Sequence, residues 1–178
     1  LFDPQQATRI PVVGIMGRSQ TAELAHLVSW LIHLSGRRTG LASSHGLFMD
    51  QRLVDAKDAR VFEASQRLLI NRALDAAVFE NSPLQVLEEG LPYDRCHVGV
   101  LTEMPDATGL QEHDIQTPEQ VRTVVRTQID LVLPEGVAVL NAEDAAVVDL
   151  AELCDGEVIY YAAHTDAPVI NQHRAAQG

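Results

Sequence analysis

A glycine-containing turn, VGIMGRSQTAE at residues 13–23, lies between an apolar run and a helical pattern. In a phosphate loop, backbone N–H groups at a helix N-terminus point at the phosphates, a lysine neutralises charge, and a Ser or Thr hydroxyl holds magnesium. The candidate phosphate contacts are Gly14, Gly17, Arg18, Ser19, Gln20 and Thr21. None is a lysine, so the turn is either a phosphate loop that has lost its chemistry or an ordinary tight turn.

Two further sets of side chains could carry chemistry. His26 and His33 are seven residues apart on a helical pattern, which can place both on one face, but no third metal ligand is nearby in the sequence. Ser44 precedes His45, a pair that could act as nucleophile and base, yet no acid that would orient the histidine is visible. We therefore expect neither a metal site nor a hydrolase site from these residues.

The elements that must position these groups alternate along the chain. Continuous apolar runs predict strands, and apolar residues at helical spacing predict helices, with Thr117 as one N-cap and Gly90 as one helix stop. A hairpin is predicted over residues 46–54, turning at Asp50-Gln51, and a long loop over 103–116. Strands are expected at 10–15, 38–43, 76–79, 97–102, 136–141 and 156–162, and helices at 19–34, 58–73, 83–90, 117–133 and 142–154.

This alternation predicts an α/β fold with three layers, in which helices cover both faces of a mostly parallel sheet of six or more strands. In such sheets, ligands bind at the carboxyl ends of the strands. At 178 residues and 46% hydrophobic content, the chain suits one compact domain.

Composition excludes several classes of partner. A formal net charge of −12 makes nucleic acid an unsuitable partner, because such binding depends on clustered Lys and Arg, and Lys57 is the only lysine. Cys96 and Cys154 lie far apart and outside metal-binding spacings, which favours reduced thiols and a cytoplasmic location. No signal-peptide pattern and no apolar run long enough to cross a membrane is present.

Several segments resemble a known family. IPVVGIMGRSQTAELAHLVSW, EGLPYDRCHVGVLTEM, LPEGVAVLNAEDAAVV and the final PVINQHRAAQG occur in the order found in the Mur-ligase-like part of cyanophycin synthetase, and together they span nearly the whole chain. The resemblance implies the central-domain fold of bacterial Mur ligases, which is related to P-loop folds. It also implies ATP-dependent amide-bond formation with Mg²⁺, in which a carboxylate becomes an acyl phosphate that an amine attacks.

The resemblance also implies particular site residues. Glu80 matches the family's metal-ligating glutamate, and Asn141 and Asp144 match residues that meet the nucleotide's base and ribose. The alternative for Asn141 and Asp144 is a turn and a helix N-cap after a strand, and for Glu80 a carboxylate left at a strand end.

This chain departs from the family's pattern at four elements. In the loop, the second glycine is Gln20, the lysine is Thr21 and the magnesium-binding hydroxyl is Ala22. The Arg-Gly-Gly run after the glutamate is replaced by residues 83–85, the family's histidine is missing near residue 107, and its helix lysine falls at 125 or 126. We therefore expect no catalytic residue in this chain and weak or absent ATP binding.

Two functions remain open. The chain is either the ATP-binding central domain of a cyanophycin-synthetase-like ligase, or a catalytically dead domain kept for structure, docking or oligomer assembly. We expect residues 1–163 to form the central domain and 164–178 to be a linker toward an absent C-terminal Mur domain, because the chain begins at Leu1 and ends in a polar run. A peptide-like polymer would then be met through flanking domains, and a homo-oligomer is conceivable.

Overall fold

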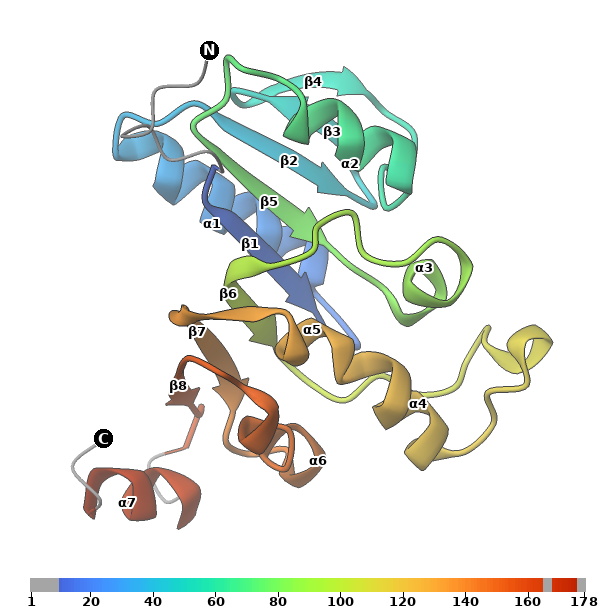
Figure 1. Ribbon diagram of the computed structural model, residues 1–178, viewed down its shortest axis with the longest axis vertical. Helices are drawn as coiled ribbons and strands as arrows, with labels where there is room; N and C mark the ends of the chain where they lie inside the picture. Colours follow the sequence, from blue (N-terminus) through green and yellow to red (C-terminus); the bar gives the residue numbers. More distant parts are fainter. Residues whose placement is uncertain (1–9, 165–167, 176–178) are drawn as a thin grey trace.

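The computed structural model describes residues 10–164 and 168–175 (Figure 1). One eight-stranded sheet has the order β4-β3-β2-β5-β1-β6-β7-β8. Six neighbouring strands run parallel to one another: β2, β5, β1, β6, β7 and β8. The remaining two, β3 and β4, form an antiparallel hairpin at the β2 edge. The strands are β1 Val12–Met16, β2 Thr39–Ser43, β3 Gly46–Met49, β4 Arg52–Asp55, β5 Ala76–Glu80, β6 Cys96–Leu101, β7 Val132–Asn141 and β8 Glu157–Tyr161.

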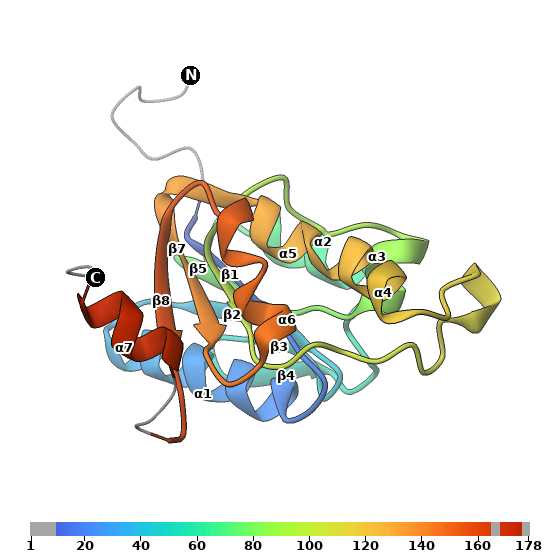
Figure 2. The same ribbon diagram turned by 90° about the horizontal axis from the view of Figure 1, so that it is seen from below.

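Helices lie on both faces of the sheet, as Figure 2 shows. α1 covers one face, α2 to α6 lie on the other, and α7 lies beside the edge strand β8. The predicted three-layer α/β fold with a mostly parallel sheet is confirmed. The helices are α1 Thr21–Leu34, α2 Phe62–Leu69, α3 Pro83–Glu88, α4 Pro118–Val125, α5 Thr127–Asp130, α6 Ala145–Val148 and α7 Pro168–Ala175, with two 3₁₀ turns, η1 Gln111–His113 and η2 Ala151–Leu153.

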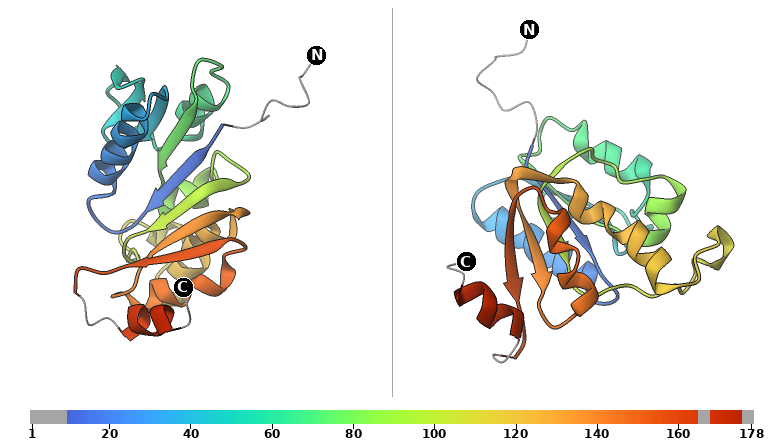
Figure 3. Two further views of the ribbon diagram at one scale, coloured as in Figure 1. Left: turned by 90° about the vertical axis from the view of Figure 1, so that its left-hand side faces the viewer. Right: turned by 60° about the horizontal axis from the view of Figure 1, so that its bottom comes forward.

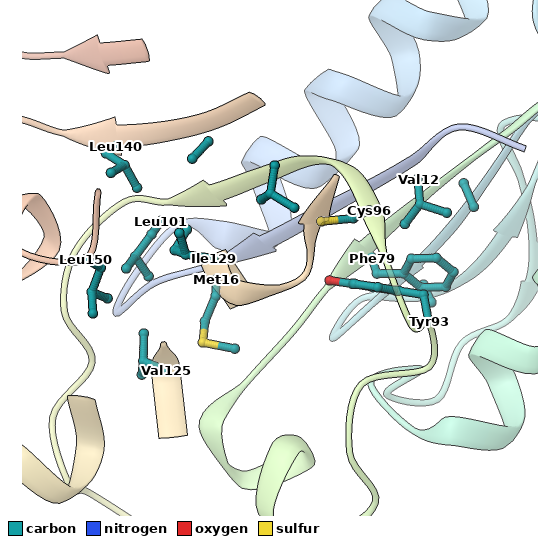
Figure 4. Close-up of a cluster of buried hydrophobic side chains, with 14 of the residues drawn as sticks. Val12, Met16, Phe79, Tyr93, Cys96, Leu101, Val125, Ile129, Leu140 and Leu150 are labelled. Carbon is teal, nitrogen blue, oxygen red and sulfur yellow. The ribbon is translucent and has the colours of Figure 1, made fainter. Parts of the chain in front are cut away.

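Alternate side chains of each strand enter two separate cores. From β1, Val12 and Met16 join the larger core, between the sheet and α2 to α6, whereas Val13 and Ile15 join the smaller core beneath α1. Figure 4 shows the larger core, where Phe79 and Tyr93 lie near Val12 and Cys96. The central strands are therefore apolar on both faces, which explains their continuous apolar runs.

Local signals set several boundaries as predicted. Thr117 and Gln120 form a complete capping box at the start of α4. Gly90 has φ 77° directly after α3, a conformation that glycine adopts readily. Asp50 and Gln51 both have positive φ, as a two-residue hairpin turn requires, so the predicted turn is confirmed.

Other predicted boundaries were wrong. The helix expected over 117–133 ends at Asp130, because Val132 already pairs with Cys96 in the sheet. The helix expected over 58–73 covers Phe62–Leu69, since Asp58 turns the chain by accepting hydrogen bonds from Arg60. The segment expected to be a helix over 142–154 is divided into α6 and η2.

The final segment has local structure of its own. Within residues 164–178, expected to be a linker, helix α7 packs on β8, where His173 meets Tyr160 edge-on with ring centroids 5.3 Å apart. The domain boundary at residue 163 stays a prediction, and residues 165–167 and 176–178 lie outside the described part. Among the described residues, none of the helices is long and apolar enough to cross a membrane.

Candidate nucleotide site

The candidate site lies at the carboxyl ends of the parallel strands. The chain leaves β1 toward β2 on one side, and later crosses to β6 on the other side of β1. Such a switch point is where ligands of open α/β sheets bind. The turn from Gly17 to Thr21 follows β1 here, Glu80 ends the neighbouring β5, and Asn141 ends β7. The topology therefore brings the predicted residues to one edge of the sheet.

Glu80 is buried, with 3% of its surface exposed, and both of its carboxylate oxygens are engaged by the protein. Thr21 Oγ1 donates to Oε1 over 2.9 Å. The backbone N–H and the hydroxyl of Ser44 donate to Oε2 over 2.7 and 2.9 Å. Arg60 Nη1 lies 3.6 Å from Oε1 and supplies the compensating positive charge.

Arg60 is itself held in place by a second carboxylate. Its Nη2 lies 2.7 Å from Asp58 Oδ2, and its Nε donates to Oδ1 over 3.1 Å. Hydrogen bonding from Arg60 lowers the pKa of Asp58, and the same bond raises the pKa of Arg60. The guanidinium therefore stands between two carboxylates, and its position beside Glu80 is fixed by this fork-shaped contact.

The residues around Glu80 do not fit a magnesium ion. Mg²⁺ takes an octahedral set of oxygen ligands, usually one or two carboxylates with waters and phosphate oxygens. Glu80 meets three hydrogen-bond donors and a guanidinium instead, so the positive charge at this position comes from the chain.

The turn after β1 is held mainly by the loop that follows β6. Arg18 Nη2 donates to the Met104 carbonyl over 2.8 Å, and Ser19 Oγ donates to Glu103 Oε2 over 3.1 Å. A Cβ on Gly17 would overlap Thr102 Oγ1, so the close approach requires glycine. Arg18 and Ser19 thus bind protein partners at the positions where contacts to phosphate were predicted.

Gln20 stands where the family has glycine, and it keeps a positive φ. At the N-cap of α1 it has φ 57° and ψ 17°. The left-handed region is accessible to non-glycine residues at a cost. The turn therefore keeps a glycine-like backbone with a side chain on it.

Gly14 lies deeper, within β1. A Cβ at this position would overlap the Tyr93 hydroxyl and the side-chain nitrogen of Gln128. These two side chains form a buried cluster with Asn81, whose Nδ2 donates to both the Tyr93 oxygen and Gln128 Oε1. Gly14 thus makes room for this buried polar cluster beneath the turn.

Asn141 and Asp144 belong to one turn, in which the Asp144 N–H donates to the Asn141 carbonyl over 3.4 Å. Asp144 is the N-cap of α6: its Oδ1 accepts from Ala146 and Val147, and its Oδ2 accepts from the Met104 N–H over 2.8 Å. Asn141 Oδ1 accepts from the Glu143 N–H, which closes a turn. These are the turn and N-cap geometries that we gave as the alternative to nucleotide contacts.

A cavity of about 570 Å³ lies beside the turn, lined by residues that include Ser19, Gln20 and Asn141. Three of the residues predicted to contact the nucleotide therefore line one cavity. Three carboxylates, Glu23, Glu103 and Glu143, also line it, and no Lys or Arg is among its lining residues. Carboxylates repel phosphate, so this cavity is electrostatically unsuited to a polyphosphate.

The other candidate groups do not assemble into sites. His33 pairs with Asp50 over 2.9 Å, while His26 lies edge-on to Phe48. Burial and the nearby His45 lower the pKa of His26. The hydroxyl of Ser44 donates to Glu80 over 2.9 Å rather than to His45.

Sequence reasoning did not place Ser44 and Arg60 beside Glu80. Ser44 begins the turn after β2, next to β5, so its position could have been inferred from the rule that carboxyl ends of neighbouring parallel strands meet. Arg60 lies in the irregular segment between β4 and α2. No periodic pattern in the sequence predicts the path of such a segment.

The fold defines the class of protein. A solved UDP-N-acetylmuramoyl-L-alanyl-D-glutamate–2,6-diaminopimelate ligase superposes on 90% of this chain with a TM-score of 0.73 and 16% identity, over 34% of its own length. Mycobacterium tuberculosis folylpolyglutamate synthase complexed with ADP matches 85% of this chain with a TM-score of 0.57 and 16% identity, over 42% of its own length. The chain has the fold of the Mur ligase central domain.

The sequence comparison is more specific. Over its whole length, the chain is 31% identical to cyanophycin synthetase from Crocosphaera subtropica, and the match covers 20% of that protein. The chain thus spans about a fifth of the length of the relatives it matches. No family model matches the sequence. The resemblance seen in the sequence motifs is confirmed: this is a domain of the Mur ligase central-domain fold, similar to a segment of cyanophycin synthetase.

Proposed function

We propose that this chain is the central domain of an ATP-dependent amide-bond ligase similar to cyanophycin synthetase, and that its own nucleotide site binds Mg-ATP weakly or not at all. Support for the ligase class comes from the whole-chain similarity to cyanophycin synthetase and from the shared fold with a synthase solved with ADP. We propose further that the full-length protein forms amide bonds with ATP and that it is cytoplasmic.

The proposal of weak or absent Mg-ATP binding rests on the hydrogen bonds that Glu80 makes within the protein. Thr21 occupies the position that the resemblance gives to the loop lysine, and its hydroxyl donates inward to Glu80. Arg60 supplies positive charge from the opposite side. A polyphosphate at this turn would find neither a lysine nor a metal-binding carboxylate with free oxygens.

Phosphoryl transfer depends on neutralising charge that spreads over the transferred group. The guanidinium of Arg18 binds the Met104 carbonyl, and the cavity beside the turn is lined by glutamates. The side chains of Ser19, Thr21 and Glu80 are likewise hydrogen-bonded to protein partners. We therefore assign no catalytic residue to the chain, and infer that chemistry in the parent protein depends on other domains.

The second candidate is a domain without catalysis, kept for structure, docking or oligomer assembly. A specific observation favours docking: one side of α1 and the adjoining sheet face expose large apolar side chains, among them Leu27, Leu31 and Ile159. In either case, we propose that residues 1–163 form the domain and that residues 164–178 lead toward a C-terminal domain. A peptide-like polymer would be met through flanking domains.

Repair of the loop tests the proposal. We expect the triple variant Gln20→Gly, Thr21→Lys, Ala22→Thr to bind ATP under conditions in which the unsubstituted chain does not. The reason is that the N-terminus of α1 still offers backbone N–H groups and a favourable dipole. Each restored contact is worth roughly 1.5–3 kcal/mol as a charge-assisted hydrogen bond, with incomplete additivity. Isothermal titration calorimetry with Mg-ATP measures the gain, and circular dichroism checks the fold.

The single variant Gln20→Gly is the matched control, because it restores the glycine without adding charge. It should leave ATP binding undetectable. A folded triple variant that shows no binding up to about 5 mM ATP would count against an eroded phosphate loop and identify the segment as an ordinary structural turn.

A further inference from the structure

One face of the sheet is only partly covered. On this face, α1 contacts β1, β5 and β2. Figure 3, left, looks onto the other half: β6, β7 and β8 lie in view, none of the described helices lies over β6 and β7, and α7 lies beside β8. Parallel sheets are normally covered on both faces, because their strands are apolar on both sides.

The uncovered half forms an apolar groove along α1. A cavity of about 570 Å³ is lined from one side by Leu24, Val28 and Ile32 of α1. Val98, Val139 and Tyr161 line its floor and far side. We call this set, with the exposed residues described next, the α1 groove.

The outer side of α1 extends this apolar surface. Leu27, Trp30, Leu31 and Leu34 are each about half exposed, at 50%, 49%, 53% and 60%. On β8, Ile159 is 45% exposed. A helix that is apolar on nearly all sides is normally buried, and contiguous apolar patches mark interaction sites. This surface therefore resembles a sheet face from which one covering helix is missing.

The dimensions of the groove fit one helix. Three parallel strands span about 10 Å across and strands of this length run about 17–20 Å. An α-helix is about 10–12 Å in diameter, and about 12 residues cover that length. A second helix beside α1 at the usual 8–10 Å separation would lie over β6 and β7.

Charge at one end of the groove restricts the occupant further. Glu23 in the first turn of α1 lies with Glu103 and Glu143 around the adjoining cavity, which shares Leu24 and Tyr161 with the groove. An arginine or lysine would complement these carboxylates. Basic residues are favoured in the last turn of a helix, so the bound helix would run antiparallel to α1. The net charge of −12 opposes a second copy of this chain.

We propose that the α1 groove binds an amphipathic α-helix of about three turns, supplied by a partner domain, with aliphatic residues on one face and Arg or Lys in its last turn. The groove buries the aliphatic face between α1 and the β6–β8 surface, and the basic end lies beside Glu23 and Glu103. The inference does not depend on nucleotide binding.

The sequence contains a single tryptophan, and Trp30 lies on the exposed side of α1, so its fluorescence can report docking. The probe is a helical peptide of about 14 residues with Leu at positions i, i+3, i+4 and i+7, Gln and Ala elsewhere, and two Arg in its last turn. We expect saturable binding with a shift of the Trp30 emission to shorter wavelength. Replacing the two Arg by Glu should weaken binding at least about tenfold at low salt, through like-charge repulsion.

The double variant Leu27→Ser, Leu31→Ser should weaken binding of the Arg peptide at least about tenfold, and because both side chains are half exposed the fold should remain. Leu53→Ser, on the exposed face of β4 at the far edge of the sheet, is the matched control. It should bind the Arg peptide as tightly as the unsubstituted chain does. Absence of saturable binding, or equal binding by the double variant, would overturn the proposal. So would sedimentation showing a dimer that this double variant dissociates, since a second copy would then be the occupant.

Discussion

At the scale of single residues, the side chains at the strand ends bind the protein itself. Glu80 accepts hydrogen bonds from Thr21 and Ser44 and lies beside Arg60, which compensates its charge. A buried carboxylate is stable only when paired and hydrogen-bonded, and these partners meet that requirement without any ligand. These contacts link β5 to the turns after β1 and β2 and give each carboxylate oxygen a partner within the protein.

Gln20 gives a prediction at the same scale. Its φ of 57° is costly for any residue with a Cβ. Gln20→Gly should therefore be more stable than Gln20→Ala by about 1 kcal/mol, because both remove the side chain and glycine alone also relieves the backbone strain. Urea denaturation of the two variants measures the difference. Equal stabilities, or a more stable alanine variant, would contradict a strained turn.

At the scale of elements, helix boundaries depend on side chains at their ends. Thr117 accepts from the Gln120 N–H, and the Gln120 side chain accepts from the Thr117 N–H, so the first turn of α4 has reciprocal partners. α4 in turn buries Val121 and Val125 in the larger core. The cap therefore fixes where a helix of the core begins.

Thr117→Ala should lower the free energy of unfolding by about 1 kcal/mol, because the Gln120 N–H loses the Thr117 hydroxyl that accepts its hydrogen bond. Thr123→Ala on the same helix is the control: its hydroxyl donates to the Glu119 carbonyl within the helix and caps nothing. We expect the control to change stability by less than half as much. Thermal or urea unfolding compares the two, and a larger loss for Thr123→Ala would show that the capping box contributes little.

The sequence was sufficient to predict the strands and the layers. Strands such as β1 and β5 are runs of five residues that are buried on both faces, and this length favours a strand over a helix. Helix ends were predicted less well: at Val132, sheet pairing with β6 overrides a helical pattern that continues past Asp130. Arg60 could not be placed at Glu80, since its position depends on the path of an irregular segment rather than on any periodic pattern.

At the scale of the whole molecule, the two faces of the sheet differ. The face toward α2 to α6 is covered and contains the larger core, while the face toward α1 is half open and apolar. The carboxyl edge between them holds the candidate nucleotide site, lined by glutamates. The chain combines the fold of a ligase central domain with the two features on which our proposals rest, a carboxyl edge lined by glutamates and a half-open apolar face.

Weak or absent ATP binding is tested by titrating the unsubstituted chain with Mg-ATP in a calorimeter, with circular dichroism to verify that the chain is folded. We expect no saturable heat up to about 5 mM nucleotide, because Glu80 is engaged by Thr21, Ser44 and Arg60 and the turn contains no lysine. Saturable binding with a dissociation constant of about 1 mM or tighter, equivalent to about −4 kcal/mol or more favourable, would contradict it.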